Sequence, residues 1–501
     1  MGHPRQQRRR RMSDGTSTAD ETAEITRAIP ELELFSDDAL QAIEAAADTI
    51  LQEIGVNFVN NPEALERWRR AGAEIEGERV RLPRGLAREL CATVPGVFTQ
   101  LARNPARSVE IGGRGLVLAP VYGPPFVHDA GRGRRYATIE DFRNFVKLGQ
   151  MARWLHHSGG TVCEPTDLPV NKRHLDMLHA HMTLSDKPFM GAATEPSRAR
   201  DCIEMCGILF GEEVVREKTV MTSLITIGSP LTFDDTMTGA LEIYAAHNQA
   251  CILSPFAVVG ATTPGSVAGT LAQLLAEVLA GAAYAQLVRK GAPVIFGPFV
   301  TTMDRHGGGT GFGTPAASQI TYGAGQLARR LGLPYRAGGA LTGARLPDAQ
   351  AAYESAASLH DGLLSGANFM LHACGWLEGG LVSSYEKFVM DADRLGVLHG
   401  FAGGVEAGLD DALDALREVG PGGHFLAREP EMAGAWQSDI FDNRPFEAWI
   451  EDGGRDAMKL ATERVRDLLE SYEPPALDPA IEDALSAYVA AKKAEMPDSF
   501  M

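Results

Sequence analysis

Short runs of apolar and small residues recur along the middle of the chain, and each is followed by a segment with helical spacing of its apolar side chains. Repeated β-then-α units without strand hairpins predict a mostly parallel sheet. About eight such units close into a barrel, so the expected fold class is α/β, a TIM (β/α)8 barrel. The predicted strands span residues 159–163, 188–193, 219–226, 250–258, 293–300, 334–340 and 368–375, and the eighth strand is not placed.

Segments of a different pattern flank this repeat. The sequence is basic and then polar before the first helix, with Met12 as an alternative start, and it lacks the apolar region of a secretion signal. The first predicted helix opens at the N-cap candidate Ser36 and stops at Gly55. The expected parts are a disordered tail (1–26), an N-terminal helical region (27–107), the barrel core (108–400) and a C-terminal helical extension packed on the barrel (401–501).

Composition and charge exclude several classes of function. The 501 residues are 45% hydrophobic, which is typical of a soluble globular protein, and their net charge of −18 is unfavourable for binding nucleic acid or an anionic membrane. The longest apolar segment, 267–288, contains Gln273, Glu277 and Gln286. Polar side chains at these positions favour a buried helix over a membrane span.

Six scattered cysteines do not suggest a disulfide framework, and they favour the reducing cytoplasm. Cys202 and Cys206 lie one helical turn apart and are interpreted as structural thiols. His372, Cys374 and Cys163 form a weak metal-ligand pattern, for which structural burial is the favoured alternative, so no metal is expected. The common hydrolase motifs GxSxG and HExxH are absent from the sequence.

The loops after the strands are the expected location of chemistry, because they converge on one face of a barrel. One of them, HACGWLEGGL, places a single carboxylate, Glu378, among apolar residues and glycines. Such a carboxylate either pairs with a basic residue or serves a cationic ligand. Trp376 is either part of an aromatic wall for a cation or core packing, and His372 is either a ligand or a core histidine. The Gly-rich loop 304–315 matches no phosphate-binding motif.

Several stretches at these loops resemble the trimethylamine methyltransferase family, which includes glycine betaine methyltransferases. They are GATTPGSVAGT (260–270), AEVLAGAAYAQL (276–287), GLPYRAGGALTGARLPDAQAAYE (332–354), GWLEGGLVSSYEKFVMD (375–391) and VGPGGHFL (419–426). The resemblance implies a TIM barrel that transfers a methyl group from an amine to the Co(I) centre of a separate, cognate corrinoid protein. No corrinoid is then expected to be held tightly by this chain.

One departure from that family concerns the substrate. The trimethylamine enzymes carry pyrrolysine in the segment matching 338–345, and Leu341 occupies that position here. A quaternary ammonium leaves as a neutral amine, whereas a neutral tertiary amine needs activation before it can leave. The resemblance and this chemistry together favour a quaternary, glycine betaine-like amine as the methyl donor.

The resemblance also suggests site residues. Glu378 matches a family carboxylate and is the expected catalytic group, so Glu378→Gln should abolish turnover without lowering thermal stability. The candidate cage residues are Tyr122, Tyr353, Trp376 and Tyr385, with packing as the alternative for each tyrosine. The candidate partners for a substrate carboxylate are Arg305, His306, Arg336 and Arg345.

Alternative functions remain open from sequence. The substrate is alternatively trimethylamine or another N-methyl donor, or the barrel binds a betaine or a corrinoid protein without catalysis. A metal-dependent hydrolase is a remote further alternative. The oligomeric state, including a homo-oligomer, is left open by the sequence.

Overall fold

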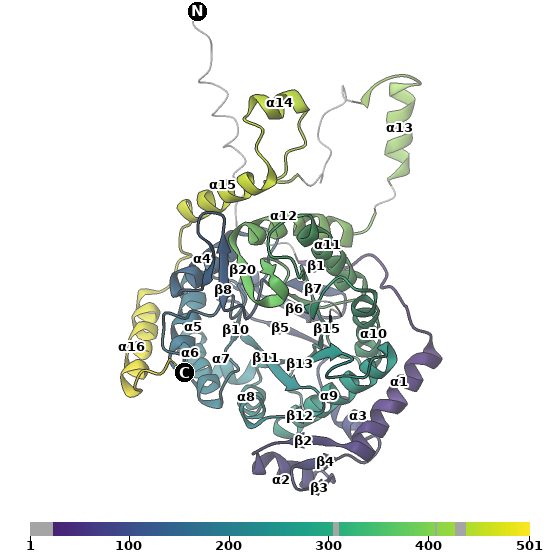
Figure 1. The fold of residues 1–501 in the computed structure, drawn as a ribbon, viewed down its shortest axis with the longest axis vertical. Helices are drawn as coiled ribbons and strands as arrows, with labels where there is room; N and C mark the ends of the chain where they lie inside the picture. The colour runs from purple at the N-terminus through teal and green to yellow at the C-terminus, as the bar shows by residue number, and fades with distance from the viewer. Residues whose placement is uncertain (1–23, 304–309, 406–407, 426–436, 501) are drawn as a thin grey trace, which may run out of the picture.

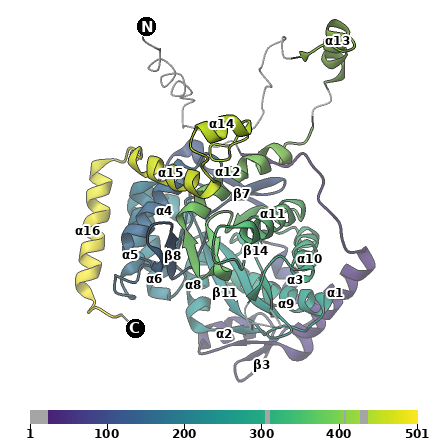
Figure 2. The same cartoon turned by 45° about the horizontal axis from the view of Figure 1, so that its top comes forward.

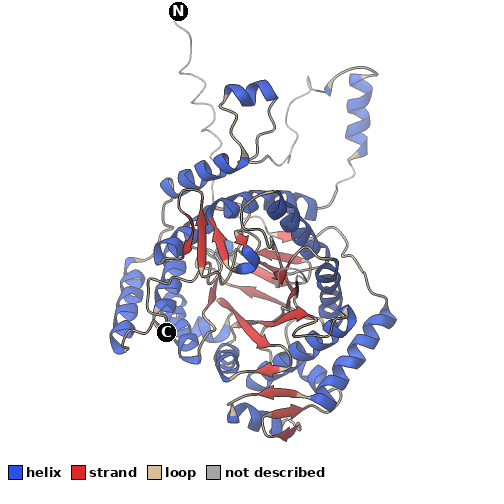
Figure 3. Ribbon diagram, viewed as in Figure 1, coloured by secondary structure: helices blue, strands red, loops and turns tan. Residues whose placement is uncertain are grey.

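The computed structural model describes residues 24–303, 310–405, 408–425 and 437–500. It has a mixed α/β architecture in which helices surround a central group of strands (Figures 1 and 3). Most of the central strands pair in parallel, as the repeat predicts. Two parallel groups are formed by β7 (Gly115–Leu118), β18 (Phe369–Leu371) and β17 (Arg336–Gly338), and by β10 (Phe189–Gly191), β11 (Met221–Gly228), β13 (Ala250–Val259), β14 (Val294–Phe296) and β15 (Phe299–Met303).

Backbone contacts link these two groups on both sides. On one side, an isolated parallel bridge joins Phe296 of β14 to Tyr335, directly before β17. On the other side, the amides of His156 and His157 donate to the Leu118 carbonyl of β7, and the Ser158 amide donates to the Pro188 carbonyl beside β10. Residues 156–160 therefore lie between β7 and β10 without forming a regular strand, which corrects the strand predicted over 159–163. β7 is a further central strand, outside those predicted from the repeat.

A ring of helices packs outside the strands (Figure 1). One of these helices, α9, is long and apolar enough to span a membrane, yet 89% of its most apolar 18-residue stretch is buried inside the protein. This agrees with the buried helix predicted over 267–288. The ring consists of α4 (Ile139–Met151), α5 (Arg173–Leu184), α6 (Pro196–Phe210), α7 (Glu212–Glu217), α8 (Asp235–Ala246), α9 (Val267–Val288), α10 (Pro315–Leu331), α11 (Ala349–Leu364) and α12 (Tyr385–Ala402).

The N-terminal region is less helical than expected. Ile25–Thr26 form β1, antiparallel to β7, so two residues of the segment predicted as a tail form a strand. The Ser36 hydroxyl accepts the Ala39 amide and caps α1, and Gly55 ends the helical segment with φ +79°, as predicted. The elements are α1 (Asp37–Thr49), η1 (Ile50–Ile54), β2 (Val56–Phe58), α2 (Pro62–Arg70), β3 (Glu74–Glu76), β4 (Arg79–Arg81), α3 (Leu86–Cys91), β5 (Val97–Gln100), η2 (Pro105–Arg107) and β6 (Val109–Gly112). Strand β12 (Thr232–Phe233) extends the β2–β4 sheet.

The C-terminal region contains two kinds of helix. α13 (Leu409–Val419) and α14 (Phe446–Glu451) have no buried residue and project from the body (Figures 1 and 2). α15 (Ala457–Glu470) packs on α4 and α12, and α16 (Pro479–Glu495) packs on α5 and α6. Only the second pair covers the ring of helices.

A small sheet is inserted where β7 and β18 end. Strand β8 (Phe126–Asp129) forms a hairpin with β9 (Gly133–Tyr136) and pairs in parallel with β20 (Val382–Ser384). β20 in turn pairs with β19 (Trp376–Leu377) through the one-turn helix η3 (Glu378–Gly380). The GWLEGGL segment therefore forms a tight hairpin at the carboxyl ends of the central strands. A short strand, β16 (Thr310–Gly311), lies against β15.

Candidate functional site

Aromatic rings from three strand ends meet at one point. Phe299 of β15 has its ring centroid 5.8 Å from that of Trp376, 5.8 Å from that of His372 and 6.2 Å from that of Phe312. The rings of His372 and Trp376 are 4.3 Å apart at an interplanar angle of 66°. We refer to Phe299, Phe312, His372 and Trp376 as the aromatic cluster. Its rings present both faces and edges, an arrangement suited to contact with a cation.

His372 occupies an unusual position in this cluster. Its backbone is left-handed, with φ +64°, which is rare for a residue with a side chain and is tolerated where the surroundings hold it. Its Nδ1 accepts the Tyr122 amide at 3.2 Å, so the ring proton of neutral His372 lies on Nε2. Burial, reinforced by the nearby Arg336 charge, holds the pKa of His372 well below its usual value. His372 is therefore a neutral donor through Nε2.

Arg336 carries a buried guanidinium beneath the cluster. The residue is 1% exposed, and its guanidinium carbon lies 5.5 Å from the centre of the Phe299 ring. Its Nε and Nη1 have no hydrogen-bond partner among the described residues, and none of the carboxylates described forms an ion pair with it. Burial lowers the pKa of Arg336 to about 10, so the group remains charged near neutrality. A buried, unpaired charge is costly unless an anion completes it.

Other deeply buried cations in the described chain have partners. Lys187 donates to the carbonyls of Gly149, Ala152 and Leu155, at 2.9, 2.9 and 2.7 Å. Lys387 donates to both carboxylate oxygens of Asp391. The lack of partners at Arg336 is therefore a local property of the aromatic site.

Leu341 and a further donor complete the site. Leu341 packs against the group formed by Val121, Phe312 and Trp376, so it lies beside the aromatic cluster. The buried Trp376 Nε1 also has no acceptor among the described residues. An apolar wall thus adjoins several hydrogen-bond donors, which is the chemistry required by a small zwitterion with a cationic head and a carboxylate.

Of the two alternatives for Glu378, pairing with a basic residue or contact with a cationic ligand, the structure shows the pairing. Its Oε2 lies 3.0 Å from Nε of Arg134 on β9, and the two side chains are 16% and 41% exposed. The Glu378 backbone is left-handed, with φ +50°. The carboxylate is therefore engaged at the rim of the site by a cation of the protein itself.

The predicted cage tyrosines are separated. Tyr122 is adjacent to the cluster through its amide contact with His372, and burial raises the pKa of its phenol to about 12. Tyr353 is 78% exposed on α11. Tyr385 is buried, stacks on Phe145 and donates to Asp141 at 2.9 Å. The structure thus keeps Trp376 and Tyr122 near the site, and it corrects the expectation for Tyr353 and Tyr385.

Of the residues predicted to bind a substrate carboxylate, the structure places one at the site and one away from it. Arg336 lies in the site, whereas the exposed Arg345 donates to the Gly343 carbonyl. Arg345 is thus not brought to the aromatic cluster. Arg305 and His306 lie outside the described residues.

Sequence reasoning did not single out Phe299 and Phe312. Phe299 opens the strand before the Gly-rich loop and Phe312 lies near the end of that loop, so the available signal was one aromatic residue on each side of its three consecutive glycines. A single phenylalanine in a sequence usually belongs to the hydrophobic core. The place of these two residues in the site is therefore recognised only once the folded position of the loop is known.

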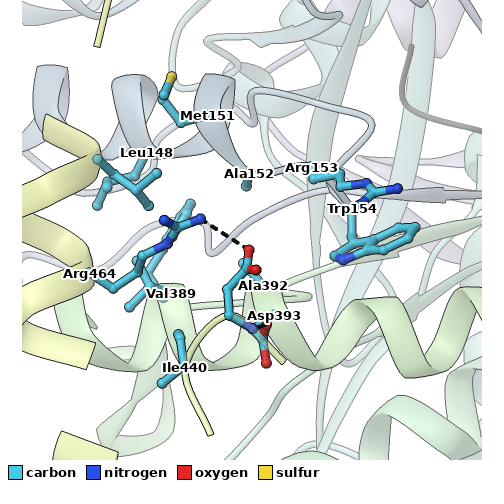
Figure 4. A pocket seen from close by; sticks show the side chains of 13 residues that line it. Leu148, Met151, Ala152, Arg153, Trp154, Val389, Ala392, Asp393, Ile440 and Arg464 are labelled. Carbon is cyan, nitrogen blue, oxygen red and sulfur yellow. Dashed lines mark hydrogen bonds and ion pairs between the residues drawn. The ribbon is translucent and has the colours of Figure 1, made fainter. Parts of the chain in front are cut away.

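A pocket elsewhere on the molecule is unrelated to this site. It lies outside the strands, between α4, α12 and α15, and Arg464 and Asp439 form an ion pair at its edge (Figure 4). Asp393 beside it accepts the Ser438 hydroxyl and the Asp439 amide, so this seam anchors the returning C-terminal segment.

The cysteines and His372, which include the candidate metal ligands, are all buried. All six cysteines are buried and free. Burial raises the pKa of Cys374 and of Cys163 well above the usual thiol value. Within the described ranges, no group of three His, Cys, Asp or Glu side chains is placed to hold a metal ion.

The family model and the relatives found by comparison with known proteins are all described as methyltransferases. Residues 2–497 match the sequence model of a family described as trimethylamine methyltransferase (MTTB). Glycine betaine methyltransferase of Desulfitobacterium hafniense (strain Y51) is 39% identical over 474 residues, covering 93% of this chain and 98% of that protein. Trimethylamine methyltransferase MttB2 of Methanosarcina mazei is 27% identical, covering 92% of this chain and 95% of that protein. A crystal structure of the hydroxylamine MtmB complex shares the fold, with a TM-score of 0.50 at 13% identity, over 87% of this chain and 89% of that chain.

Proposed function

The chain belongs to the trimethylamine methyltransferase family, and we propose that it transfers a methyl group from a glycine betaine-like quaternary amine to the Co(I) centre of a cognate corrinoid protein. The methyl donor is a small zwitterion. The corrinoid is the methyl acceptor and arrives on a separate partner, in the cytoplasm.

The observation that carries this proposal is the unpartnered Arg336 beneath the aromatic cluster. A substrate carboxylate would supply the missing anion and accept hydrogen bonds from Arg336 and from His372 Nε2. The trimethylammonium head would then lie against Phe299, Phe312 and Trp376, whose rings attract a cation without a counter-charge. Trimethylamine has no carboxylate and would leave the Arg336 charge buried and unpaired, so the betaine is favoured over it.

The reaction needs positioning more than proton transfer. The Co(I) electron pair forms the bond to the methyl carbon while the C–N electron pair leaves with the nitrogen, giving methyl-Co(III) and a neutral dimethylamino product. The positive charge of the ammonium disappears in this step. Anchoring the carboxylate at Arg336 would hold one methyl group toward the acceptor, and the apolar walls would exclude water. No proton donor is required for a quaternary donor, which accords with Leu341 at the position of pyrrolysine.

We further propose that the central strands form a closed (β/α)8 barrel with this site at its mouth. In support, residues 156–160 hydrogen-bond to both β7 and β10, and the Phe296–Tyr335 bridge adjoins β14 and β17. The carboxyl ends of parallel strands would then face one opening, where the corrinoid protein must approach.

The test is methyl transfer by the full-length protein to Co(I) corrinoid protein under anaerobic conditions. Glycine betaine, carnitine, trimethylamine and tetramethylammonium are compared by the absorbance change from Co(I) to methyl-Co(III). Transfer from glycine betaine, with little from tetramethylammonium, is expected. Transfer from trimethylamine alone would overturn the substrate, and calorimetric binding of glycine betaine without transfer would identify a non-catalytic binding protein.

A further inference from the structure

We infer that Arg134 and Glu378 form a positioning pair that holds the Trp376 wall of the cation site, in place of a direct role for Glu378 on the substrate. The inference rests on the proposed function and assigns a task to the small sheet β8–β9–β19–β20. It concerns two residues that lie 244 positions apart in the chain.

The first observation is that Arg134 is fixed on its own hairpin. Its guanidinium carbon lies 3.6 Å from the centre of the Phe126 ring, and that ring contacts the Tyr136 ring at a centroid distance of 4.6 Å and an interplanar angle of 35°. Stacking on an aromatic ring restricts a guanidinium before its ion pair forms. Forming the ion pair therefore costs less side-chain conformational entropy. The Arg134–Glu378 contact is therefore more directed than an ordinary surface ion pair.

The second observation is that Glu378 lies in the turn that carries Trp376. A Cβ on Gly380, which has φ +97°, would lie 2.5 Å from the Trp376 ring, so the indole packs directly on the turn. Glu378 itself has φ +50°, a conformation that a residue with a side chain adopts only when its surroundings hold it. Arg134 is the charged partner that holds it.

The third observation links this turn to Leu341. The Glu378 amide donates to the Ala344 carbonyl at 2.8 Å, and the Gly379 amide donates to the Thr342 carbonyl at 3.0 Å. The turn thus connects the Trp376 wall to the loop that carries Leu341. Displacement of Glu378 would move two walls of the site together.

The experiment is a double-substitution cycle with Arg134→Gln, Glu378→Gln and the combined variant, measured as methyl transfer from glycine betaine to Co(I) corrinoid protein. Each single variant is expected to raise KM by about fivefold with kcat little changed, and the combined variant should be no worse than either alone. Arg134→Lys keeps the charge and should restore part of the affinity. Arg132→Gln is the matched control, because Arg132 pairs with Asp129 at 3.1 Å on the same hairpin, away from Glu378.

The outcomes separate the two ideas. If Glu378→Gln abolishes kcat while Arg134→Gln behaves as wild type, Glu378 acts on the substrate directly and the positioning pair is overturned. Additive effects of the two substitutions, or an equal effect of Arg132→Gln, would also overturn it. A wild-type protein that transfers no methyl group from glycine betaine would overturn the proposed function, and this inference with it.

Discussion

Two arginines beside the same group of strands are buried to nearly the same extent. Arg27 is 2% exposed and Arg336 is 1% exposed, and burial lowers the pKa of each to about 10. Arg27 follows β1, and it donates to the carbonyls of Ala367 and Gly366, which directly precede β18. Arg336 is the first residue of β17, in register with the first residue of β18, and its Nε and Nη1 have no partner in the described chain.

The difference lies in what surrounds each guanidinium. The chain supplies carbonyl acceptors for Arg27, and Glu31 lies 3.7 Å from its Nε. The guanidinium carbon of Arg336 lies 5.5 Å from the centre of the Phe299 ring, and none of the described carboxylates pairs with it. A charge left incomplete in an otherwise well-packed protein indicates a ligand group that completes it. We therefore assign Arg27 to stability and Arg336 to binding.

The largest expected effect is on activity, from Arg336→Met. Loss of the buried partner of the substrate carboxylate should lower kcat/KM for glycine betaine by about a thousandfold, or about 4 kcal/mol. The free energy of unfolding should be unchanged or higher, because an unpaired buried charge is removed. Initial rates of methyl transfer and urea unfolding measure the two effects.

Tetramethylammonium provides the control for that variant. It has the cationic head without the carboxylate, so its calorimetric affinity should not fall in Arg336→Met. A variant that loses stability and keeps its activity would show that Arg336 is structural, and the contrast with Arg27 would disappear.

The matching change is Arg27→Met, which should act on stability. The carbonyls of Ala367 and Gly366 would lose their donor, and we expect the free energy of unfolding to fall by about 3 kcal/mol. Urea unfolding measures this loss. The methyl-transfer rate per folded molecule should stay at the wild-type value, and a selective loss of that rate would contradict the division of roles between the two arginines.

The sequence predicts more of the fold than of the site. The β-then-α rhythm, the Ser36 cap and the buried helix at 267–288 are local patterns, and they are confirmed. β7 was not assigned to the repeat because it is four residues long and lies among other short extended pieces. The N-terminal region was expected to be helical because its strands are only three residues long.

Site residues depend on contacts between distant segments, which periodicity does not encode. Arg336 was selected because its charge suits a carboxylate, which is visible in the sequence, although it lies in strand β17 and not in the loop that follows. The pairing of Glu378 with Arg134 joins residues 244 positions apart, so the sequence left both alternatives open. Tyr353 was misplaced because a helix that begins after a strand end also has an outer face, and Tyr353 lies on it.

A smaller effect is expected from Phe299→Leu in the aromatic cluster. Phe299 contacts the rings of His372, Trp376 and Phe312, and its loss removes one ring face from the site. We expect KM for glycine betaine to rise about tenfold, corresponding to about 1.4 kcal/mol of cation–aromatic attraction, with kcat little changed. Phe299→Tyr retains the ring and is the matched control. An unchanged KM in Phe299→Leu would place the ammonium elsewhere.

The smallest expected effect is that of pH, and it sharpens the assignment of donors. Burial holds the pKa of His372 well below its usual value, so the ring is neutral near neutral pH and stays neutral as the pH rises. Arg336, with its pKa lowered to about 10, stays charged until the pH approaches that value from below and loses its proton above it. The kcat/KM for glycine betaine should therefore vary by less than about twofold between about pH 6 and about pH 9. Rates measured against pH with free Co(I) corrinoid as a fixed acceptor test this directly. A gain in kcat/KM on acidification, with a midpoint near the ordinary histidine pKa, would mean that His372 binds the carboxylate as a cation, and Arg336 would no longer be the sole charged anchor.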